Sequence, residues 1–303
     1  MSVLILTNCY FVIAQSIPKV NKGSITRIEN FNSKYVASRN IDIWLPQDYN
    51  INNKYAVLYM QDGQMLYDSN TTWNKKSWML QDAITKLTNE NKINNVIVVG
   101  IWNGGERRHS EYFPQKPFQQ LSKAQQEVVY NGVRKNNISV FNNYELNADN
   151  YLKFIVEELK PFIDQKFSTH TNFNNTFIGG SSMGGLISMY AVCEYPKIFG
   201  GAICMSTHWP GIFEMDNNPI PEAFINYLAS NLPRAKNHKI YFDCGDKTLD
   251  ALYPPIQNKV DEVMRKKGYS EKNWMTQYFP GQEHSEVAWS QRVEIPLSFM
   301  LAK

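Results

Sequence analysis

The chain has 303 residues, which is enough to bury a sizeable hydrophobic core in one large domain. Hydrophobic residues make up 43% and charged residues 19% of the sequence, a composition that excludes an intrinsically disordered protein. The net charge of +3 is small and the lysines and arginines are scattered, so we expect no nucleic-acid partner.

The first residues form a short apolar run that ends in small and polar residues before Pro18. Such a run is typical of a secretory signal peptide and is too short to span a membrane. We therefore predict a signal peptide over residues 1–16, export to the periplasm or the exterior, and no stable membrane insertion. A buried N-terminal strand is the alternative, and it would leave the protein in the cytoplasm. Residues 17–303 are expected to form a single domain.

From residue 41 onward, short apolar runs alternate with longer segments of helical periodicity. The runs predicted as strands are 41–45, 56–60, 96–101, 176–178, 202–205, 239–242 and 276–279. The segments predicted as helices are 77–89, 151–167, 183–194, 255–267 and 286–301. This alternation predicts an α/β fold in which a mostly parallel central sheet has helices on both faces. Ligands bind beyond the carboxyl ends of such strands, so the chemistry is expected directly after each run.

The segment 114–150 interrupts this alternation because it is polar and rich in Gln and Asn. It is too long for a simple connection between a strand and a helix, and it contains an amphipathic stretch at 121–133. One interpretation is an inserted cap or lid over the site. The other is a solvated insertion with no role in the chemistry.

A G-x-S-x-G pattern is formed by Gly180, Ser182 and Gly184, between a strand-like run and a helical segment. In this strand, turn and helix context the serine occupies a strained turn, and the glycines allow other backbone to pass closely. We predict that Ser182 is a nucleophile. The N–H of Met183 follows it at a helix N-terminus, where it is predicted to stabilise an oxyanion.

A serine nucleophile needs a base, and three histidines follow Ser182 in the chain. His238 precedes a strand and therefore lies at the wrong end of the sheet, whereas His208 follows a strand and lies at the right end. His284 lies between the last strand and the last helix, in a loop that can carry an imidazole over the serine. His284 is therefore the predicted base.

The acid that orients the base is expected in the loop after the strand at 239–242. Asp243 is assigned to the strand, and Asp246 and Asp250 both remain candidates. Either one gives the order Ser, Asp, His along the chain, which is the order of α/β-hydrolases.

Arg108, Glu111 and Tyr112 follow the strand that ends at Ile101. They are in place to contact a substrate, but a structural ion pair that braces this loop is the interpretation we favour.

Five segments of the chain carry a family resemblance: 59–64, 108–114, 180–185, 206–209 and 283–286. Together they resemble the putative esterase family, which includes esterase D, enterochelin esterases, and feruloyl and acetylxylan esterases. The resemblance runs from about Arg39 to Leu301, and the segments around Ser182 and His284 are its most specific parts. It implies an α/β-hydrolase fold.

The resemblance also implies roles for individual residues. It indicates the N–H of Gln64, which follows Gly63, as the second oxyanion donor. The spacing to Tyr253 favours Asp250 as the acid, but Gly245 is followed by Asp246 where members often have Thr, so Asp246 stays open.

His208 and Trp209 resemble positions that line the acyl or alcohol pocket of the family. Ordinary packing of the indole is the alternative for Trp209.

Together these residues predict a serine-dependent carboxylic ester hydrolase that forms an acyl-enzyme on Ser182. The expected substrate is a small-molecule or glycan-linked ester, and neither a metal nor an organic cofactor is required. An acyltransferase on the same fold is one alternative. A non-catalytic module that binds carbohydrate or another ligand is the other.

Overall fold

The computed structural model describes residues 16–134 and 136–303. The predicted signal peptide lies outside the described residues except for Ser16. Within these two ranges, no helix combines the length and the apolar composition that a membrane span requires.

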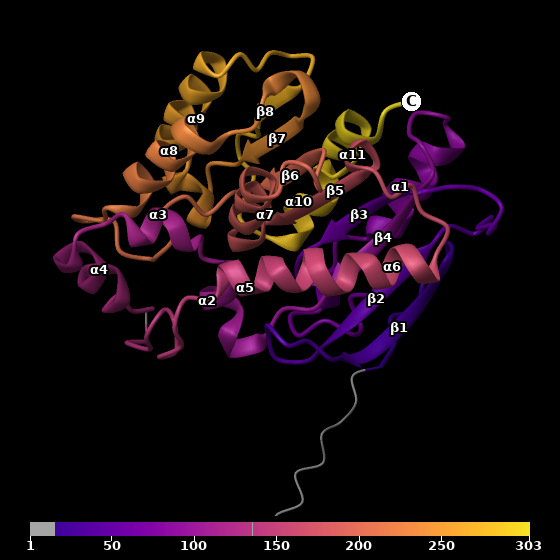
Figure 1. Ribbon diagram of the computed structural model, residues 1–303, viewed down its shortest axis with the longest axis horizontal. Helices are drawn as coiled ribbons and strands as arrows, with labels where there is room; N and C mark the ends of the chain where they lie inside the picture. Colours follow the sequence, from indigo (N-terminus) through magenta and orange to yellow (C-terminus); the bar gives the residue numbers. More distant parts are fainter. Residues whose placement is uncertain (1–15, 135) are drawn as a thin grey trace, which may run out of the picture.

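An eight-stranded sheet forms the centre of the molecule, in the order β1-β2-β4-β3-β5-β6-β7-β8 (Figure 1). The strands are β1 (Ser24–Phe31), β2 (Arg39–Leu45), β3 (Ala56–Met60), β4 (Val96–Ile101), β5 (Thr176–Ser181), β6 (Gly201–Met205), β7 (Lys239–Cys244) and β8 (Trp274–Tyr278). β2 pairs antiparallel with β1 and with β4, and all other neighbours are parallel. The predicted mostly parallel sheet is confirmed.

The strand β1 was not predicted, and its position explains why. It lies at the edge of the sheet and its side chains are exposed or only partly buried, so its sequence lacks the apolar run of an inner strand. Its Arg27 forms an ion pair at 2.7 Å with Asp42 of β2.

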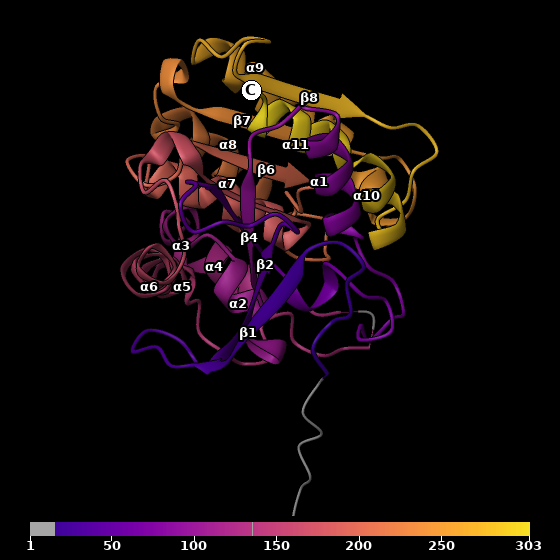
Figure 2. The same ribbon diagram turned by 90° about the vertical axis from the view of Figure 1, so that its right-hand side faces the viewer.

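The helices lie in two layers that enclose the sheet, as Figure 2 shows. They are α1 (Leu80–Asn89), α2 (Arg108–Tyr112), α3 (Gln115–Gln119), α4 (Lys123–Tyr130), α5 (Ala148–Lys153), α6 (Lys160–Lys166), α7 (Met183–Glu194), α8 (Ile220–Asn231), α9 (Pro254–Lys266), α10 (Glu286–Arg292) and α11 (Glu294–Leu301). In one hydrophobic cluster, the helices α1, α10 and α11 pack on one face of the sheet. In the larger cluster, the helices from α5 through α9 pack on the other face. The predicted helices on both faces are confirmed.

Some helix boundaries differ from the prediction. The helix expected at 151–167 is α5 and α6 joined by a π-helical turn (Phe154–Leu159), and the helix expected at 286–301 is divided at Val293. The helix α8 was not predicted.

The inserted segment contributes α3 and α4. A capping box at Ser122 starts α4, and the rings of Phe118 and Phe141 pack on Phe113, which anchors the segment beside α8.

His109 lies under this aromatic cluster and links it to the chain beyond β6. Its Nε2 donates a hydrogen bond to the carbonyl oxygen of Gly211 at 2.7 Å, and its ring packs against Phe141. Burial lowers the pKa of His109 to about 3, so the folded protein holds this imidazole neutral.

This burial predicts a loss of stability in acid. When the pH falls below about 6.5, the unfolded chain binds a proton at His109, whereas the folded chain binds it only near pH 3. The free energy of unfolding therefore decreases as the pH falls from about 6.5 to about 3. His109 alone contributes a loss of about 2 kcal/mol between about pH 7.5 and about pH 5. Urea unfolding of the wild type and His109→Gln, whose amide keeps a donor for Gly211, measures this share. An equal acid sensitivity in both proteins would contradict the prediction.

Candidate active site

Ser182 lies between the end of β5 and the start of α7, near the middle of the sheet. Its φ of 58° and ψ of −125° are strained for a residue with a side chain. The Ser182 N–H donates to the carbonyl of Met205 at 3.0 Å, and its own carbonyl accepts from Leu186 at 3.1 Å. These bonds hold a sharp turn at the carboxyl edge of the sheet.

The glycines on either side of Ser182 make room for the residue that follows β3. A Cβ on Gly180 would lie 2.8 Å from the Cβ of Gln61, and one on Gly184 would lie 3.0 Å from the same atom. The turn can therefore pack directly against Gln61 only because both positions lack a side chain.

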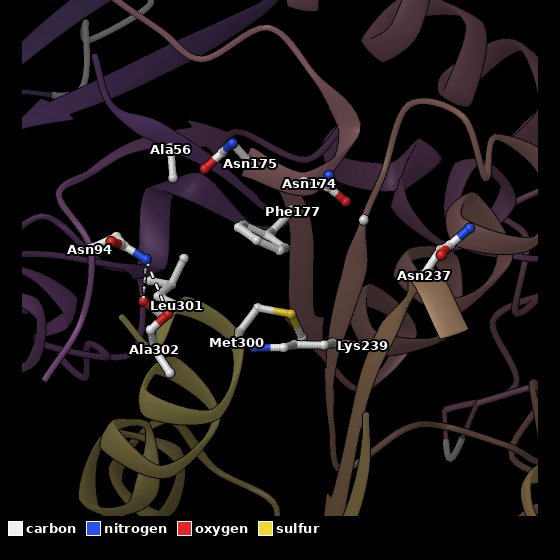
Figure 3. Close-up of a pocket in the computed structure, with 11 residues that line it drawn as sticks. Ala56, Asn94, Asn174, Asn175, Phe177, Asn237, Lys239, Met300, Leu301 and Ala302 are labelled. Carbon is white, nitrogen blue, oxygen red and sulfur yellow. Dashed lines mark hydrogen bonds between the residues drawn. The ribbon is translucent and has the colours of Figure 1, made fainter. Parts of the chain in front are cut away.

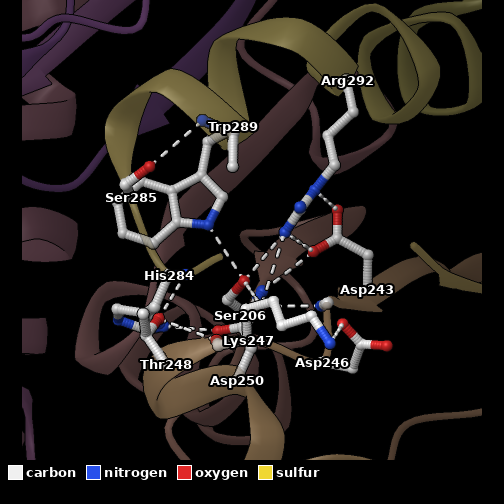
Figure 4. A network of polar contacts seen from close by, with 12 residues as sticks. Ser206, Asp243, Asp246, Lys247, Thr248, Asp250, His284, Ser285, Trp289 and Arg292 are labelled. Atoms are coloured by element: carbon white, nitrogen blue, oxygen red, sulfur yellow. Dashed lines mark hydrogen bonds and ion pairs between the residues drawn. The ribbon is translucent and has the colours of Figure 1, made fainter. Parts of the chain in front are cut away.

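His284 and Asp250 are brought together by two neighbouring loops. Asp250 lies in the 3₁₀ helix η6 (Thr248–Leu252) after β7, and His284 lies between β8 and α10. The Nδ1 of His284 is 2.6 Å from Oδ1 of Asp250 (Figure 4). Since an ionised carboxylate only accepts hydrogen bonds, the proton sits on Nδ1 and leaves Nε2 as an acceptor.

Asp250 is held in its ionised form. Burial by itself raises the pKa of this carboxyl, but the hydrogen bonds from His284, Gly245 and Ser206 outweigh burial and keep the pKa below its ordinary value. Asp250 is therefore a buried anion beside the imidazole at neutral pH.

Asp246 occupies a different place from Asp250. Its carboxylate accepts from the Gly281 N–H at 2.8 Å and from the Tyr278 hydroxyl at 3.2 Å, and Lys247 lies 3.5 Å away. Among the described residues, Asp250 and not Asp246 contacts His284. Asp246 braces the turn that leads into the His284 loop.

Ser182 and His284 line one cleft of about 510 Å³ at the carboxyl ends of the strands. Trp73, Trp78 and Trp289 line it together with Lys76 and Glu286. Trp73 is 82% exposed, so the cleft is open to solvent at this rim.

The three tryptophans were not singled out from the sequence. Trp73 and Trp78 lie in the polar connection that precedes α1, and Trp289 lies in a helix where an apolar residue is ordinary. An aromatic residue in an otherwise polar segment was the available signal for Trp73.

Tyr253 is a further contact of Ser182 that sequence reasoning missed. Its hydroxyl lies next to the Ser182 side chain and 2.8 Å from Nδ1 of His208. His208 is buried, which lowers its pKa well below the ordinary value and keeps it neutral. Tyr253 thus lies between His208 and Ser182.

Met183 directly follows Ser182 in the chain, and Gln64 lines the same cleft as Ser182. Met183 is the first residue of α7, so its N–H points out of a helix N-terminus. Gln64 lies in the 3₁₀ helix η1 (Gly63–Met65) and lines the cleft, and its side-chain oxygen accepts from the Asn103 N–H at 3.2 Å. A Cβ on Gly63 would lie 2.4 Å from the backbone of Gly100, so this glycine lets η1 approach β4.

Arg108 lines the cleft and also forms an ion pair. Its Nε and Nη2 donate to the two carboxylate oxygens of Asp62 at 2.6 and 2.7 Å, and the side chain is 29% exposed. Glu111 pairs instead with the buried Arg39 at 2.8 Å, and Tyr112 is buried. Ion pairs thus brace the loop after β4, but the partners are Asp62 for Arg108 and Arg39 for Glu111, and substrate contact by Arg108 stays a prediction.

Trp209 is buried and does not appear among the described residues that line the cleft. Its Nε1 donates to Oε1 of Gln257 at 2.8 Å and its ring packs on Phe242. The structure places this indole in the core.

None of residues 114–134 or 136–150 lines the cleft either. A lid formed by this insertion therefore stays a prediction.

A second pocket, of about 150 Å³, lies at the other end of the strands, away from Ser182 (Figure 3). Ala56, Phe177 and Lys239 line it at the amino ends of β3, β5 and β7. Asn94 closes one side by donating to the carbonyl of Ala302 at 3.0 Å. It holds none of the predicted catalytic residues, and His238 lies at this same end, just before β7.

Comparison with known proteins gives a family and a fold. A model of the family described as Putative esterase matches residues 34–294. The uncharacterized protein YjcH of Bacillus subtilis (strain 168) is 22% identical over 188 residues, which cover 61% of this chain and 62% of that protein. The endo-1,4-beta-xylanase/feruloyl esterase of Xylanibacter ruminicola is 22% identical over 288 residues, which cover 91% of this chain and 31% of that protein. This chain thus spans less than two thirds of the length of either relative.

Among solved structures, the ferulic acid esterase AmCE1/Fae1A of Anaeromyces mucronatus is similar with a TM-score of 0.60 and 17% identity. The superposition covers 98% of this chain and 99% of that one. This likeness extends the α/β-hydrolase fold to nearly the whole chain.

Proposed function

Because this chain belongs to the putative esterase family, we propose that it is a carboxylic ester hydrolase that works through an acyl-enzyme on Ser182. One observation carries the proposal. A serine on a strained turn and a histidine held by a buried carboxylate line the same open cleft. A strained serine and an oriented imidazole are the two parts that acyl transfer by a serine requires.

In the proposed first step, the Ser182 hydroxyl donates its hydrogen bond to Nε2 of His284. The imidazole takes the proton as Oγ attacks the ester carbonyl, and Asp250 stabilises the imidazolium. The carbonyl electron pair moves onto oxygen, and the N–H groups of Met183 and Gln64 donate hydrogen bonds to this oxyanion.

Collapse of this intermediate re-forms the carbonyl and breaks the ester bond to the alcohol. His284 returns its proton to the leaving oxygen, and the acyl group remains on Ser182. Water then enters, loses a proton to His284 and releases the acid by the same steps in reverse order. The cleft is open beside Trp73, so water has access to the acyl-enzyme, which favours hydrolysis over acyl transfer.

We propose that the substrate is a glycan-linked ester or a small aromatic ester, met after export to the periplasm or the exterior. The relatives named as feruloyl esterases support this class, as do the tryptophans of the cleft. Hydrolysis of p-nitrophenyl acetate, methyl ferulate and a feruloyl-arabinose ester, each followed by acid release, tests the proposal. Rates equal to those in buffer for all three esters would contradict it.

Trp73 offers a test of the sugar-linked part of this proposal. An exposed indole at the rim can stack on a sugar ring, a contact of about 1 kcal/mol or more. We expect Trp73→Ala to raise KM for the feruloyl-arabinose ester by about tenfold and to leave p-nitrophenyl acetate unaffected. Trp73→Phe, which keeps a flat ring, should fall in between. An equal effect on both esters would contradict a platform for the sugar.

A further inference from the structure

Ser206 lies directly behind Asp250, on the side away from His284. It follows β6, is buried, and has a φ of 42°, which is strained for a residue with a side chain. Its N–H donates to Asp243 of the neighbouring strand, both to the carbonyl at 2.9 Å and to Oδ1 at 3.0 Å. The backbone thus holds the Ser206 hydroxyl in the interior beside the carboxylate of Asp250.

Two donors point at this hydroxyl. Nε1 of Trp289 lies 2.9 Å from its oxygen, and Nη2 of Arg292 lies 2.8 Å from it (Figure 4). An indole and a guanidinium can only donate, so they occupy both lone pairs of the oxygen. The single hydrogen of Ser206 is therefore left for Oδ2 of Asp250, which lies at 2.7 Å.

The direction of this hydrogen bond determines which oxygen of Asp250 bonds to His284. Oδ2 receives the Ser206 hydroxyl and also the Gly245 N–H, which lies at 2.7 Å. Oδ1 is then left to His284, at 2.6 Å. The carboxylate cannot turn without breaking two hydrogen bonds in a buried place, where each unmade bond is costly.

Arg292 is fixed in turn by a buried ion pair. Its Nε and Nη2 donate to Asp243 at 3.1 and 3.0 Å, and its Nη2 lies 3.8 Å from Oδ2 of Asp250. The guanidinium therefore bonds to Asp243 and Ser206 and only approaches Asp250. Ser206 thus links the guanidinium of Arg292 to Asp250, and Asp250 keeps its hydrogen bond with His284.

We propose that Ser206 is a positioning residue for ester hydrolysis. Oriented by Trp289 and Arg292, it fixes the rotation of Asp250 and thereby the tautomer and the direction of His284. This inference rests on the proposed function. Trp289, Arg292, Ser206 and Asp250 form a hydrogen-bonded relay. The titratable groups that face this relay are His284, Tyr253 and Cys244 around Asp250, and Asp243 and Tyr241 around Arg292.

Ser206→Ala tests the proposal because it removes the hydroxyl and keeps the Cβ. We expect kcat to fall about 10- to 100-fold with little change in KM, since the imidazole loses its alignment and not its substrate. Asp250, with one donor fewer, stabilises the protonated imidazole more strongly, so the acidic limb of the pH profile of kcat/KM moves to higher pH by about half a unit. The proton resonance of His284 Nδ1–H should shift as well.

Ser188→Ala is the matched control, since it removes a buried hydroxyl bonded only to the Gly184 carbonyl, at 2.7 Å, in the part of the chain that the structure describes. It should keep the wild-type pH profile and resonance. If Ser206→Ala does not fold, Arg292→Lys keeps a cation for Asp243, removes one donor from Ser206, and should give a smaller shift of the same sign.

An acidic limb that stays in place or moves to lower pH, together with an unchanged resonance, would overturn the positioning role. The resonance is measured without substrate, so this failure differs from a failure of the proposed function. The latter would appear as hydrolysis that survives in Ser182→Ala.

Discussion

Ser182→Ala is expected to reduce kcat for p-nitrophenyl acetate by about 10⁴-fold or more while the protein stays folded. The variant lacks the atom that attacks the carbonyl of the substrate ester in the proposed mechanism. It keeps His284, Asp250 and the backbone donors, so the residual rate reports binding and oxyanion stabilisation alone. Alanine and serine bear a similar strain at a φ of 58°, so little loss of stability is expected.

The neighbouring serine provides the matched control. Ser181 is the last residue of β5 and is buried, and it has an ordinary strand conformation. Ser181→Ala should therefore keep the rate within a few-fold of the wild type. A similar loss in both variants, or full activity in Ser182→Ala, would contradict the assignment of the nucleophile.

Asp250→Asn is expected to reduce kcat by about 10⁴-fold, through the wrong tautomer of His284. The Ser206 hydroxyl and the Gly245 N–H both donate to the Oδ2 position, so the amide oxygen of the asparagine must sit there. Its amide nitrogen then faces Nδ1 of His284, which has to accept. The imidazole proton moves to Nε2, which can no longer take the proton of Ser182.

Asp246→Asn separates this effect from a general loss of loop order. Asp246 lies in the same connection as Asp250, but its carboxylate bonds to Gly281 and Tyr278. We expect the activity of Asp246→Asn to stay within a few-fold of the wild type. An active Asp250→Asn and an inactive Asp246→Asn, measured with the same ester, would reverse the assignment of the acid.

The inner sheet was predictable because its strands are buried on both faces. Runs such as 56–60 and 96–101 are continuously apolar, and the structure buries every residue of β3 and β4. The edge strand β1 lacked this signal. The positions of Ser182 and His284 followed from the same alternation, since Ser182 comes directly after β5 and His284 lies in the loop after β8, both at the carboxyl ends of the strands.

The choice between Asp246 and Asp250 could not be made from spacing alone. Both follow β7 within a few residues, and the 3₁₀ turn η6 decides which one faces His284. The burial of Trp209 was equally open, because a residue just after a strand can point into the cleft or into the core. Here its indole nitrogen finds a partner in Gln257 of α9.

The relay behind Asp250 was beyond sequence reasoning for a different reason. Its members come from the ends of β6 and β7, from η6 and from α10, so no local pattern contains them. In its own segment, each residue is of a type that commonly occurs in a helix, a strand or a turn, so none of them indicates a functional role. Only the hydrogen-bond geometry shows that Ser206 has one partner left for its proton.

In the proposed mechanism Ser182 carries the acyl group, and covalent labelling tests this most directly. A fluorophosphonate reacts with a serine that an oriented histidine activates. After labelling, mass spectrometry is expected to find one adduct per chain, on the peptide that contains Ser182, with esterase activity lost in proportion. Full activity in protein that carries the adduct, or an adduct on another residue with Ser182 unmodified, would contradict an acyl-enzyme on Ser182.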